Sequence, residues 1–414
     1  MKGKVADEAL APEGRKKIDW VDKNMPVMKE VEELLKTEKP FSGKRVGISI
    51  HLEAKTARLA SAIRDGGAEV FVTSSNPLST QDDVAAALNE EEGITVYSRH
   101  GVDEEEYVWQ LDKVLEGKPE IIVDDGGDLV KQLHGPRSDL AENVIGGAEE
   151  TTTGVNRLKA LDRQDELTFP MFAVNDAKMK YLFDNRYGTG QSSWDALMRT
   201  TNLTVAGSVA VVVGYGWCGR GIAMRAGGLG ANVIVVEVDP IKALEARMDG
   251  YRVMSIEEAA PEGDFFVTAT SNIKVIPRRA LEKVKDGAVL SNAGHFDVEI
   301  DLEALEEMSV DREVVRQNIE RYKLGDGRDV YVIGKGRLVN LAAGDGHPAQ
   351  IMDISFALQA LTAKYIVDNE GLEDKLYSVP EAVDLQVAEM KLDSLGIELD
   401  ELTQDQKDYL NDLK

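Results

Sequence analysis

The chain has 414 residues, of which 43% are hydrophobic and 29% charged, a composition typical of globular proteins with two or three domains. Acidic residues outnumber basic ones by 74 to 48, and the net charge of −26 disfavours nucleic acids and anionic membranes as partners. One cysteine, Cys218, excludes an internal disulfide framework, while the lack of a signal-peptide core and of an apolar run of roughly 20 residues predicts a cytoplasmic protein.

Strand-like and helix-like stretches alternate from residue 44 onward, which is the pattern of a parallel α/β domain. Ser79 is the expected N-cap of a helix that ends near residue 93. The predicted strands lie at 44–51, 69–75, 94–99 and 120–128.

Polar side chains gather where these strands end. His51, the segment 73–76 and the cluster 124–128 all occupy such positions. Ligands of open α/β sheets bind beyond the carboxyl ends of the strands, so a histidine and several carboxylates at this edge indicate a site. The same residues also fit a strand end followed by a glycine turn, and spacing alone favours neither interpretation.

A second α/β unit begins near residue 203 with a strand, a glycine-rich turn and a helix. Gly214, Gly216 and Gly219 satisfy the G-x-G-x-x-G pattern, which lets backbone N–H groups approach a pyrophosphate. Glu237 ends the next strand, where a carboxylate binds ribose hydroxyls and repels a 2′-phosphate, so NAD is favoured over NADP. Cys218 lies inside this turn, either as a redox-sensitive thiol or, as we favour, as a small tolerated residue.

Other candidate functional residues lie outside the glycine turn. His295 and His347 each follow a glycine in a loop after a strand, and loops concentrate function. Lys180 and Asp184 would lie four apart on one helix face, although a surface ion pair of little energetic weight is the alternative. A helix is expected over 351–368, ahead of a polar, acidic C-terminus.

Six uncommon motifs follow one another in a fixed order: DDGGD (124–128), EETTTG (149–154), KYLFDNRYG (180–188), GYGWCGRG (214–221), NAGHFDVEID (292–301) and GRLVNLAAGDGHP (336–348). Together they resemble the adenosylhomocysteinase (S-adenosyl-L-homocysteine hydrolase) family, and the resemblance extends from about residue 44 to the C-terminus.

The resemblance implies two doubly wound parallel-sheet α/β domains and a short C-terminal helical segment. Residues 1–188 and 347–395 would form the substrate-binding domain, residues 189–346 the Rossmann-type NAD-binding domain, and residues 396–414 the C-terminal segment. The family is usually tetrameric. We therefore expect a homo-oligomer that binds NAD and a small nucleoside thioether, without a metal.

The resemblance also implies reversible hydrolysis of S-adenosyl-L-homocysteine to adenosine and L-homocysteine. In this family NAD⁺ first oxidises the ribose 3′-hydroxyl, which acidifies the C4′ proton; elimination, water addition and re-reduction follow. An ordinary NAD-dependent dehydrogenase is the alternative enzyme class, and a non-catalytic NAD-binding regulator is the alternative outside enzymes.

The family's site residues carry over motif by motif. Lys180 and Asp184 would handle the 3′-hydroxyl and its proton, which requires a lowered pKa of the lysine in a closed, desolvated site. Glu150 would bind the ribose hydroxyls, Asp125 would move the C4′ proton, and His51 and His295 would serve the C5′ side. Expected substrate contacts come from Glu53, Lys55, Thr56, Asn185 and His347, the last at the base-binding edge, and cofactor contacts from Thr151, Thr152, Thr153, Asn185, Gly214, Gly216, Gly219, Glu237 and Asn340.

Two departures from the family pattern concern the cofactor. Thr189 stands where cysteine often follows the DNxYG motif near the nicotinamide; threonine can donate a hydrogen bond there but cannot form a thiolate. Many members also end in an extension with Lys and Tyr that reaches a neighbouring subunit's NAD. This sequence ends at QKDYLNDLK, and Lys407 and Tyr409 are the candidate replacements.

A third departure concerns the purine. The common Met-Thr-x-Glu or Met-Thr-x-Gln after the histidine is replaced here by Leu52, Glu53, Ala54 and Lys55. Lysine has three donors and no acceptor, so it suits the carbonyl of hypoxanthine and opposes adenine's amino group, at a cost of about 1–3 kcal/mol. Alternatively, Lys55 turns outward to an acid while Glu53 accepts from adenine. S-Inosyl-L-homocysteine is therefore as well supported as S-adenosyl-L-homocysteine.

Overall fold

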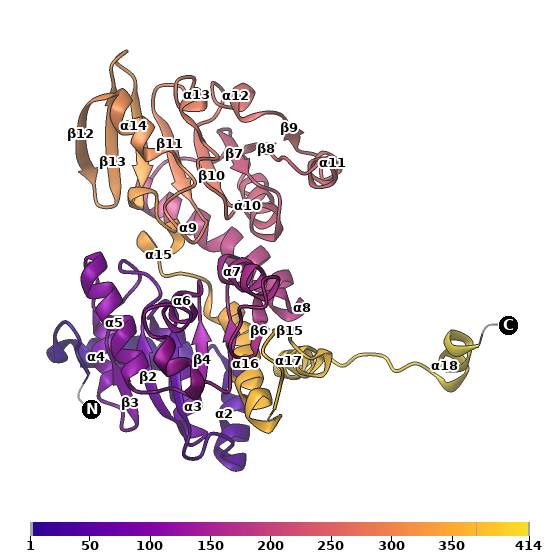
Figure 1. Cartoon of the computed structure of the whole chain (residues 1–414). Helices are drawn as coiled ribbons and strands as arrows, with labels where there is room; N and C mark the ends of the chain where they lie inside the picture. Colours follow the sequence, from indigo (N-terminus) through magenta and orange to yellow (C-terminus); the bar gives the residue numbers. More distant parts are fainter. Residues whose placement is uncertain (1–2, 370, 413–414) are drawn as a thin grey trace.

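The computed structural model describes residues 3–369 and 371–412, which form two sheets of mainly parallel strands flanked by helices (Figure 1). The first sheet has seven parallel strands in the order β15-β6-β5-β4-β1-β2-β3. Its strands are β1 (Arg45–Ser49), β2 (Glu69–Thr73), β3 (Ile94–Val96), β4 (Ile121–Asp124), β5 (Gly146–Glu149), β6 (Met171–Ala173) and β15 (Leu376–Ser378).

Amphipathic helices cover the first sheet, and their apolar faces pack with its buried strands into two hydrophobic clusters. The helix α2 packs against α3 and against α16, a helix from the C-terminal part of the chain. The helical elements of this unit are η1 (Glu8–Leu10), α1 (Ala11–Asp22), α2 (Pro26–Glu38), α3 (Ala54–Asp65), α4 (Asp82–Asn89), α5 (Glu104–Glu116), α6 (Asp128–Leu133), η2 (Ser138–Asn143), α7 (Thr152–Asp162), η3 (Val174–Asp176), α8 (Lys178–Lys180) and the π-helical η4 (Tyr181–Gly188).

The second sheet has eight strands in the order β12-β13-β14-β11-β10-β7-β8-β9. Six of them are parallel, whereas β12 and β13 form an antiparallel hairpin at one edge, which the strand pattern did not predict. The strands are β7 (Val209–Val213), β8 (Asn232–Val236), β9 (Arg252–Val253), β10 (Phe265–Thr268), β11 (Ala288–Asn292), β12 (Ser309–Arg316), β13 (Ile319–Leu324) and β14 (Asp329–Ile333). The helices are α9 (Thr189–Thr201), α10 (Trp217–Gly228), α11 (Pro240–Met248), α12 (Ile256–Ala259), α13 (Arg278–Leu281), α14 (Leu302–Met308), η5 (Gly334–Gly336) and α15 (Val339–Ala342).

The chain then returns to the first unit. The helix α16 (Ala349–Asp368) confirms the predicted helix, β15 adds an edge strand beside β6, and α17 (Glu381–Ser394) packs against α16. The helix α18 (Gln404–Asn411) projects away from both units, with its side chains exposed (Figure 1). The exact domain boundaries at 188/189 and 346/347 stay a proposal. No helix within the described residues is both long and apolar enough to span a bilayer.

The prediction that Ser79 caps a helix is wrong. The helix α4 begins at Asp82 and has Gln81 at its N-cap position. The Ser79 hydroxyl instead lies 2.8 Å from His51 Nδ1 and 2.9 Å from the Ser74 hydroxyl. A serine that resembles a helix cap in sequence therefore contacts a candidate catalytic residue.

Replacing Asp353 by alanine is expected to lower the free energy of unfolding by about 3 kcal/mol. This fully buried carboxylate accepts hydrogen bonds from the Val27 and Met28 amides at the start of α2, and it pairs with Lys391 of α17 at 2.9 Å. Chemical denaturation measures the loss. The control Glu381→Ala removes an exposed pair with Lys178 and should change stability by less than about 1 kcal/mol; equal effects of both substitutions would contradict the assigned role of Asp353.

Candidate active site

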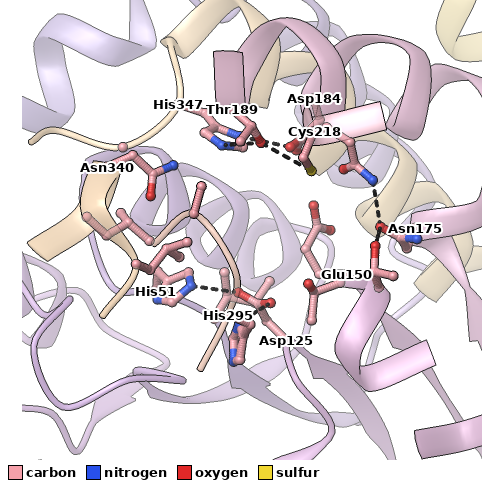
Figure 2. A pocket seen from close by; sticks show the side chains of 18 of the residues that line it. His51, Asp125, Glu150, Asn175, Asp184, Thr189, Cys218, His295, Asn340 and His347 are labelled. Atoms are coloured by element: carbon pink, nitrogen blue, oxygen red, sulfur yellow. Dashed lines mark hydrogen bonds and ion pairs between the residues drawn. The ribbon is translucent and has the colours of Figure 1, made fainter. Parts of the chain in front are cut away.

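Three neighbouring parallel strands bring the predicted acid–base residues to one edge of the first sheet. His51 follows β1, Asp125 follows β4 and Glu150 follows β5. The strand register sets Ser49 beside Asp124 and Asp124 beside Glu149, so the residues just beyond the strands are also neighbours. All three side chains line one cavity, which loops of the second unit close from the opposite side (Figure 2).

At one end of the cavity, two histidines flank a carboxylate (Figure 2). His51 Nε2 lies 3.4 Å from Asp125 Oδ2, and His295 Nδ1 lies 3.8 Å from Asp125 Oδ1. Burial lowers the pKa of His51 to about 4, even though Asp125 opposes this shift, so the ring is neutral near pH 7. One ligand atom from each of the three residues lies within 4.8 Å of the others, a composition that could hold a metal ion; the absence of a metal stays a prediction.

A second cluster surrounds the buried ammonium of Lys180. Its Nζ atom lies 2.9 Å from Asn185 Oδ1, 3.3 Å from Glu150 Oε1 and 3.4 Å from Asp184 Oδ1. The π-helical segment η4 carries Asp184 and Asn185 back toward the lysine. The alternative of a surface ion pair is wrong, because the Lys180 and Asp184 side chains are only 6% and 3% exposed.

The expectation that the closed site lowers the pKa of Lys180 is also wrong. Burial alone would lower this pKa, but the charges of Asp184 and Glu150 raise it above its usual value. The pKa values of the two carboxylates shift in opposite directions. Burial would raise the pKa of Asp184, but Lys180 and His347 hold it well below its usual range, whereas burial raises the pKa of Glu150 to about 8.

Glu53 and Lys55 form a buried pair that lines the cavity beside His51. Glu53 is the N-cap of α3: its carboxylate accepts from the Lys55 amide at 3.0 Å and pairs with Lys55 Nζ at 2.8 Å. Lys55 Nζ also donates to the Asp345 carbonyl at 3.0 Å, and Thr56 donates its hydroxyl proton to the His51 carbonyl. The alternative that Lys55 turns outward is therefore wrong, since its side chain is 7% exposed.

The His347 ring lies at the Lys180 end of the cavity. Its Nδ1 atom is 2.8 Å from Asp184 Oδ1, and its Nε2 atom is 3.3 Å from the Thr189 hydroxyl (Figure 2). The loop that carries it does reach the Glu53–Lys55 pair, through the Asp345 carbonyl. The ring itself contacts Asp184 and Thr189, so the base-edge role predicted for His347 stays a prediction.

A groove along the second sheet has the features of a dinucleotide site. Gly214 has φ +97°, and a Cβ on Gly219 would lie 1.9 Å from the Gly214 carbonyl oxygen, so the turn tolerates only glycine at these positions. A Cβ on Gly216 would meet no protein atom within 4 Å, which leaves the approach of a pyrophosphate open. The Glu237 carboxylate closes the turn by accepting from the Tyr215 and Val238 amides, and it lines the groove.

The groove and the cavity meet at a shared wall. Six residues line both: Thr152, Asn175, Asn185, Cys218, Ala269 and Ser271. Asn340 faces the cavity nearby and donates to the Ser192 hydroxyl, while its buried Oδ1 atom has no hydrogen-bond partner within the described residues. An unpartnered buried acceptor beside the groove fits the carboxamide N–H₂ of a nicotinamide.

Two family models match the chain, "S-adenosyl-L-homocysteine hydrolase" over residues 2–139 and "S-adenosyl-L-homocysteine hydrolase, NAD binding domain" over residues 185–346. An adenosylhomocysteinase of Pyrococcus abyssi is 58% identical, over 98% of this chain and 96% of that protein. The chain belongs to the S-adenosyl-L-homocysteine hydrolase family. This assignment confirms the resemblance, the α/β class with a Rossmann-type domain, the hydrolase class and NAD as the cofactor.

Both purine branches of the family are represented among close relatives. An S-inosyl-L-homocysteine hydrolase of Methanopyrus kandleri is 57% identical, over 98% of this chain and 96% of that protein. Another, from Methanocaldococcus jannaschii, is 54% identical over 99% of this chain and 98% of that protein. Overall identity therefore does not separate the adenosyl from the inosyl branch.

Several residues that support the candidate site were missed from the sequence. Asn175 joins the Thr152 hydroxyl to the Asn185 amide, and Glu149 joins two site loops by accepting from the Gly126 and Thr151 amides. Glu149 could have been found from the sequence, because it directly precedes Glu150 in the EETTTG motif. Other missed residues are Ser79, Ser355 and Gln359.

Gly216→Ala is expected to weaken NAD binding at least tenfold, about 1.4 kcal/mol, without changing the free energy of unfolding. The added methyl group contacts no protein atom but narrows the approach of the pyrophosphate to the turn. Calorimetric titration of NAD and chemical denaturation measure the two quantities. In the matched variant Gly219→Ala, both the NAD affinity and the free energy of unfolding should fall, because the methyl group collides with the Gly214 carbonyl. Wild-type NAD affinity in Gly216→Ala would show that the pyrophosphate binds elsewhere.

Proposed function

We propose that the chain reversibly hydrolyses the thioether of S-adenosyl-L-homocysteine, giving adenosine and L-homocysteine, with the inosyl thioether as the second candidate substrate. The observation that carries the proposal is the shared wall between groove and cavity. Lys180 contacts Asn185 of this wall, whereas His51 and Asp125 line only the cavity, and this separation supports two different proton-transfer roles on one ribose.

The cofactor explains how a protein can hydrolyse an unactivated thioether. NAD⁺ bound in the groove would accept a hydride from the ribose C3′ and return it after hydrolysis, and the 3′-ketone acidifies the C4′ proton in between. Thr151, Thr152, Thr153, Asn185, Asn340 and Glu237 are the residues we propose to hold it, together with the three glycines of the turn.

At the 3′-hydroxyl, the Lys180 cluster would bind and move a proton. Lys180 is charged in the site without ligands, so it starts as a donor that orients the hydroxyl. When Glu150 is ionised, transfer of the lysine proton to Glu150 Oε1, at 3.3 Å, leaves a neutral amine that accepts the 3′-hydroxyl proton. Asp184 remains an anion throughout and fixes the ammonium in place.

At C4′ and C5′, the Asp125–histidine cluster would move the remaining protons. Asp125 takes the C4′ proton, and the 3.4 Å separation from His51 Nε2 lets that proton reach the neutral ring. The imidazolium then protonates the departing sulfur, and the regenerated imidazole activates the incoming water. His295 lies on the other side of Asp125 and closes the cavity from the second unit.

The Glu53–Lys55 pair would recognise the purine. Lys55 offers a donor and Glu53 an acceptor, because Glu53 Oε1 and one N–H of Lys55 remain outside the contacts of the pair. Adenine presents a donor at its six-position and an acceptor at N1, whereas hypoxanthine presents the reverse. This pair is the specific observation that supports the inosyl thioether as a second candidate.

The hydrolase function is tested by incubating the purified enzyme with either thioether. Homocysteine should appear in many turnovers while NADH stays at or below one equivalent per active site. The reason is that the hydride taken from the ribose is transferred back to the ribose within each turnover. Absorbance of NADH and a thiol reagent measure the two products. Lys180→Ala should lose at least a hundredfold in kcat, as expected for the loss of a general acid–base group. Continuous stoichiometric NADH formation would identify an ordinary dehydrogenase, and absence of both products a non-catalytic NAD-binding protein.

Lys55→Met is expected to shift the ratio of kcat/KM values toward the adenosyl thioether by about tenfold, because Lys55 at the six-position would donate a charge-assisted hydrogen bond to the hypoxanthine carbonyl but would oppose the adenine amino group. Glu53 remains to accept from the adenine amino group. Steady-state kinetics with both substrates measure the ratio. The reciprocal variant Glu53→Gln serves as the matched control, and an unchanged ratio in Lys55→Met would show that Lys55 does not contact the base.

We also propose that the protein is a cytoplasmic homo-oligomer, a tetramer as in most of its family. Exposed apolar side chains in and just before α11 support an interface there: Val238, Ile241, Leu244 and Met248 are 97%, 73%, 57% and 76% exposed.

A further inference from the structure

Two polar side chains on one face of α16 are aimed at the Lys180 cluster. Ser355 and Gln359 lie four residues apart and are fully buried in an otherwise largely apolar helix. The Ser355 hydroxyl donates to Asp184 Oδ2 at 2.7 Å, and Gln359 Nε2 donates to Glu150 Oε2 at 2.5 Å. Each of the two carboxylates beside Lys180 is therefore held by its own neutral donor from this helix.

The two carboxylates depend on these donors to different degrees. Asp184 Oδ1 also lies 2.8 Å from Nδ1 of His347, so Asp184 keeps a close polar partner when Ser355 is removed. Glu150 is held by Gln359 at Oε2, whereas its buried Oε1 atom has no hydrogen-bond partner within the described residues and lies 3.3 Å from Lys180 Nζ. The hydrogen bond from the Gln359 amide thus fixes Glu150 Oε2 and leaves Oε1 directed at the lysine.

We propose that Gln359 is a positioning residue of the hydrolase: its amide anchors Glu150 Oε2 and stabilises the ionised form of Glu150, whose free Oε1 atom receives the ribose hydroxyl and the Lys180 proton. This inference rests on the proposed function of the cavity. Gln359 does not line the cavity, so it acts on the substrate only through Glu150.

The electrostatic environment of Glu150 makes this anchor consequential near neutral pH. The charged groups that face it are Lys180 from α8, Asp184 from η4 and Asp125 after β4. Burial raises the pKa of Glu150, as do the charges of Asp184 and Asp125, whereas the lysine charge and the hydrogen bond from Gln359 lower it; the net pKa is about 8. Without that hydrogen bond the pKa rises, and a larger fraction of Glu150 is protonated at pH 7.

The test compares Gln359→Met with the wild-type holoenzyme by infrared titration of the protonated-carboxyl band, assigned to Glu150 with the variant Glu150→Gln. Methionine keeps the length of the side chain but removes its N–H donor. We expect the midpoint of the Glu150 band to rise by about 1 pH unit. The acid limb of the kcat/KM profile should rise by the same amount, because activity is lost as pH falls through the pKa of Glu150, and activity should recover at higher pH.

Two controls on the same helix separate positioning from packing. Ser355→Ala removes the donor to Asp184, which retains Lys180 and His347, so the acid limb should stay in place. Thr362→Val replaces a buried hydroxyl that has no hydrogen-bond partner within the described residues, and it accounts for repacking of α16 alone. Gln359→Leu is the second variant if the methionine variant does not fold.

An unchanged midpoint in both folded Gln359 variants would overturn the proposal, as would an equal rise in Thr362→Val. The infrared readout does not need turnover. A shifted midpoint in a protein that hydrolyses neither thioether would therefore support the positioning role while refuting the proposed function.

Discussion

A buried ammonium between two carboxylates is the interaction on which the site depends. Lys180 contacts Glu150 and Asp184 at 3.3 and 3.4 Å, and none of the three side chains exceeds 6% exposure. Uncompensated charges are costly in such surroundings, so the fold must supply further donors to the carboxylates. The chain provides three of them from two elements: His347 from the loop after the second unit, and Ser355 and Gln359 from α16.

The sequence was informative where function depends on local pattern. The glycine turn, its acid Glu237 and the polar residues beyond the strands of the first sheet are encoded within short segments, and the structure gathers them as neighbours of one groove and one cavity. The strand alternation likewise predicted both parallel sheets. The hairpin of β12 and β13 escaped prediction because β12 is an exposed edge strand in which four of eight residues are charged.

Partners distant in sequence could not be predicted. Ser355 and Gln359 are 171 and 209 residues away from the carboxylates they contact, and no local pattern encodes such pairs. The pKa of Lys180 was mispredicted for the same reason, since its direction depends on how close the carboxylates come after folding. Thr189 is a related case: its hydroxyl lies 3.6 Å from the Cys218 sulfur, so a thiol stands beside this position although the cysteine is contributed by the glycine turn.

The return of the chain to the first unit has a consequence for biosynthesis. The residues of α16 and β15 are made only after the whole second unit, yet α16 packs into the core of the first unit and β15 completes its sheet. During translation the second unit therefore has its full sequence available before the first unit does. The first unit therefore stays partly assembled until its last helix and strand are made, and a ribosome-bound chain that ends before α16 lacks the Ser355 and Gln359 donors to the two carboxylates beside Lys180.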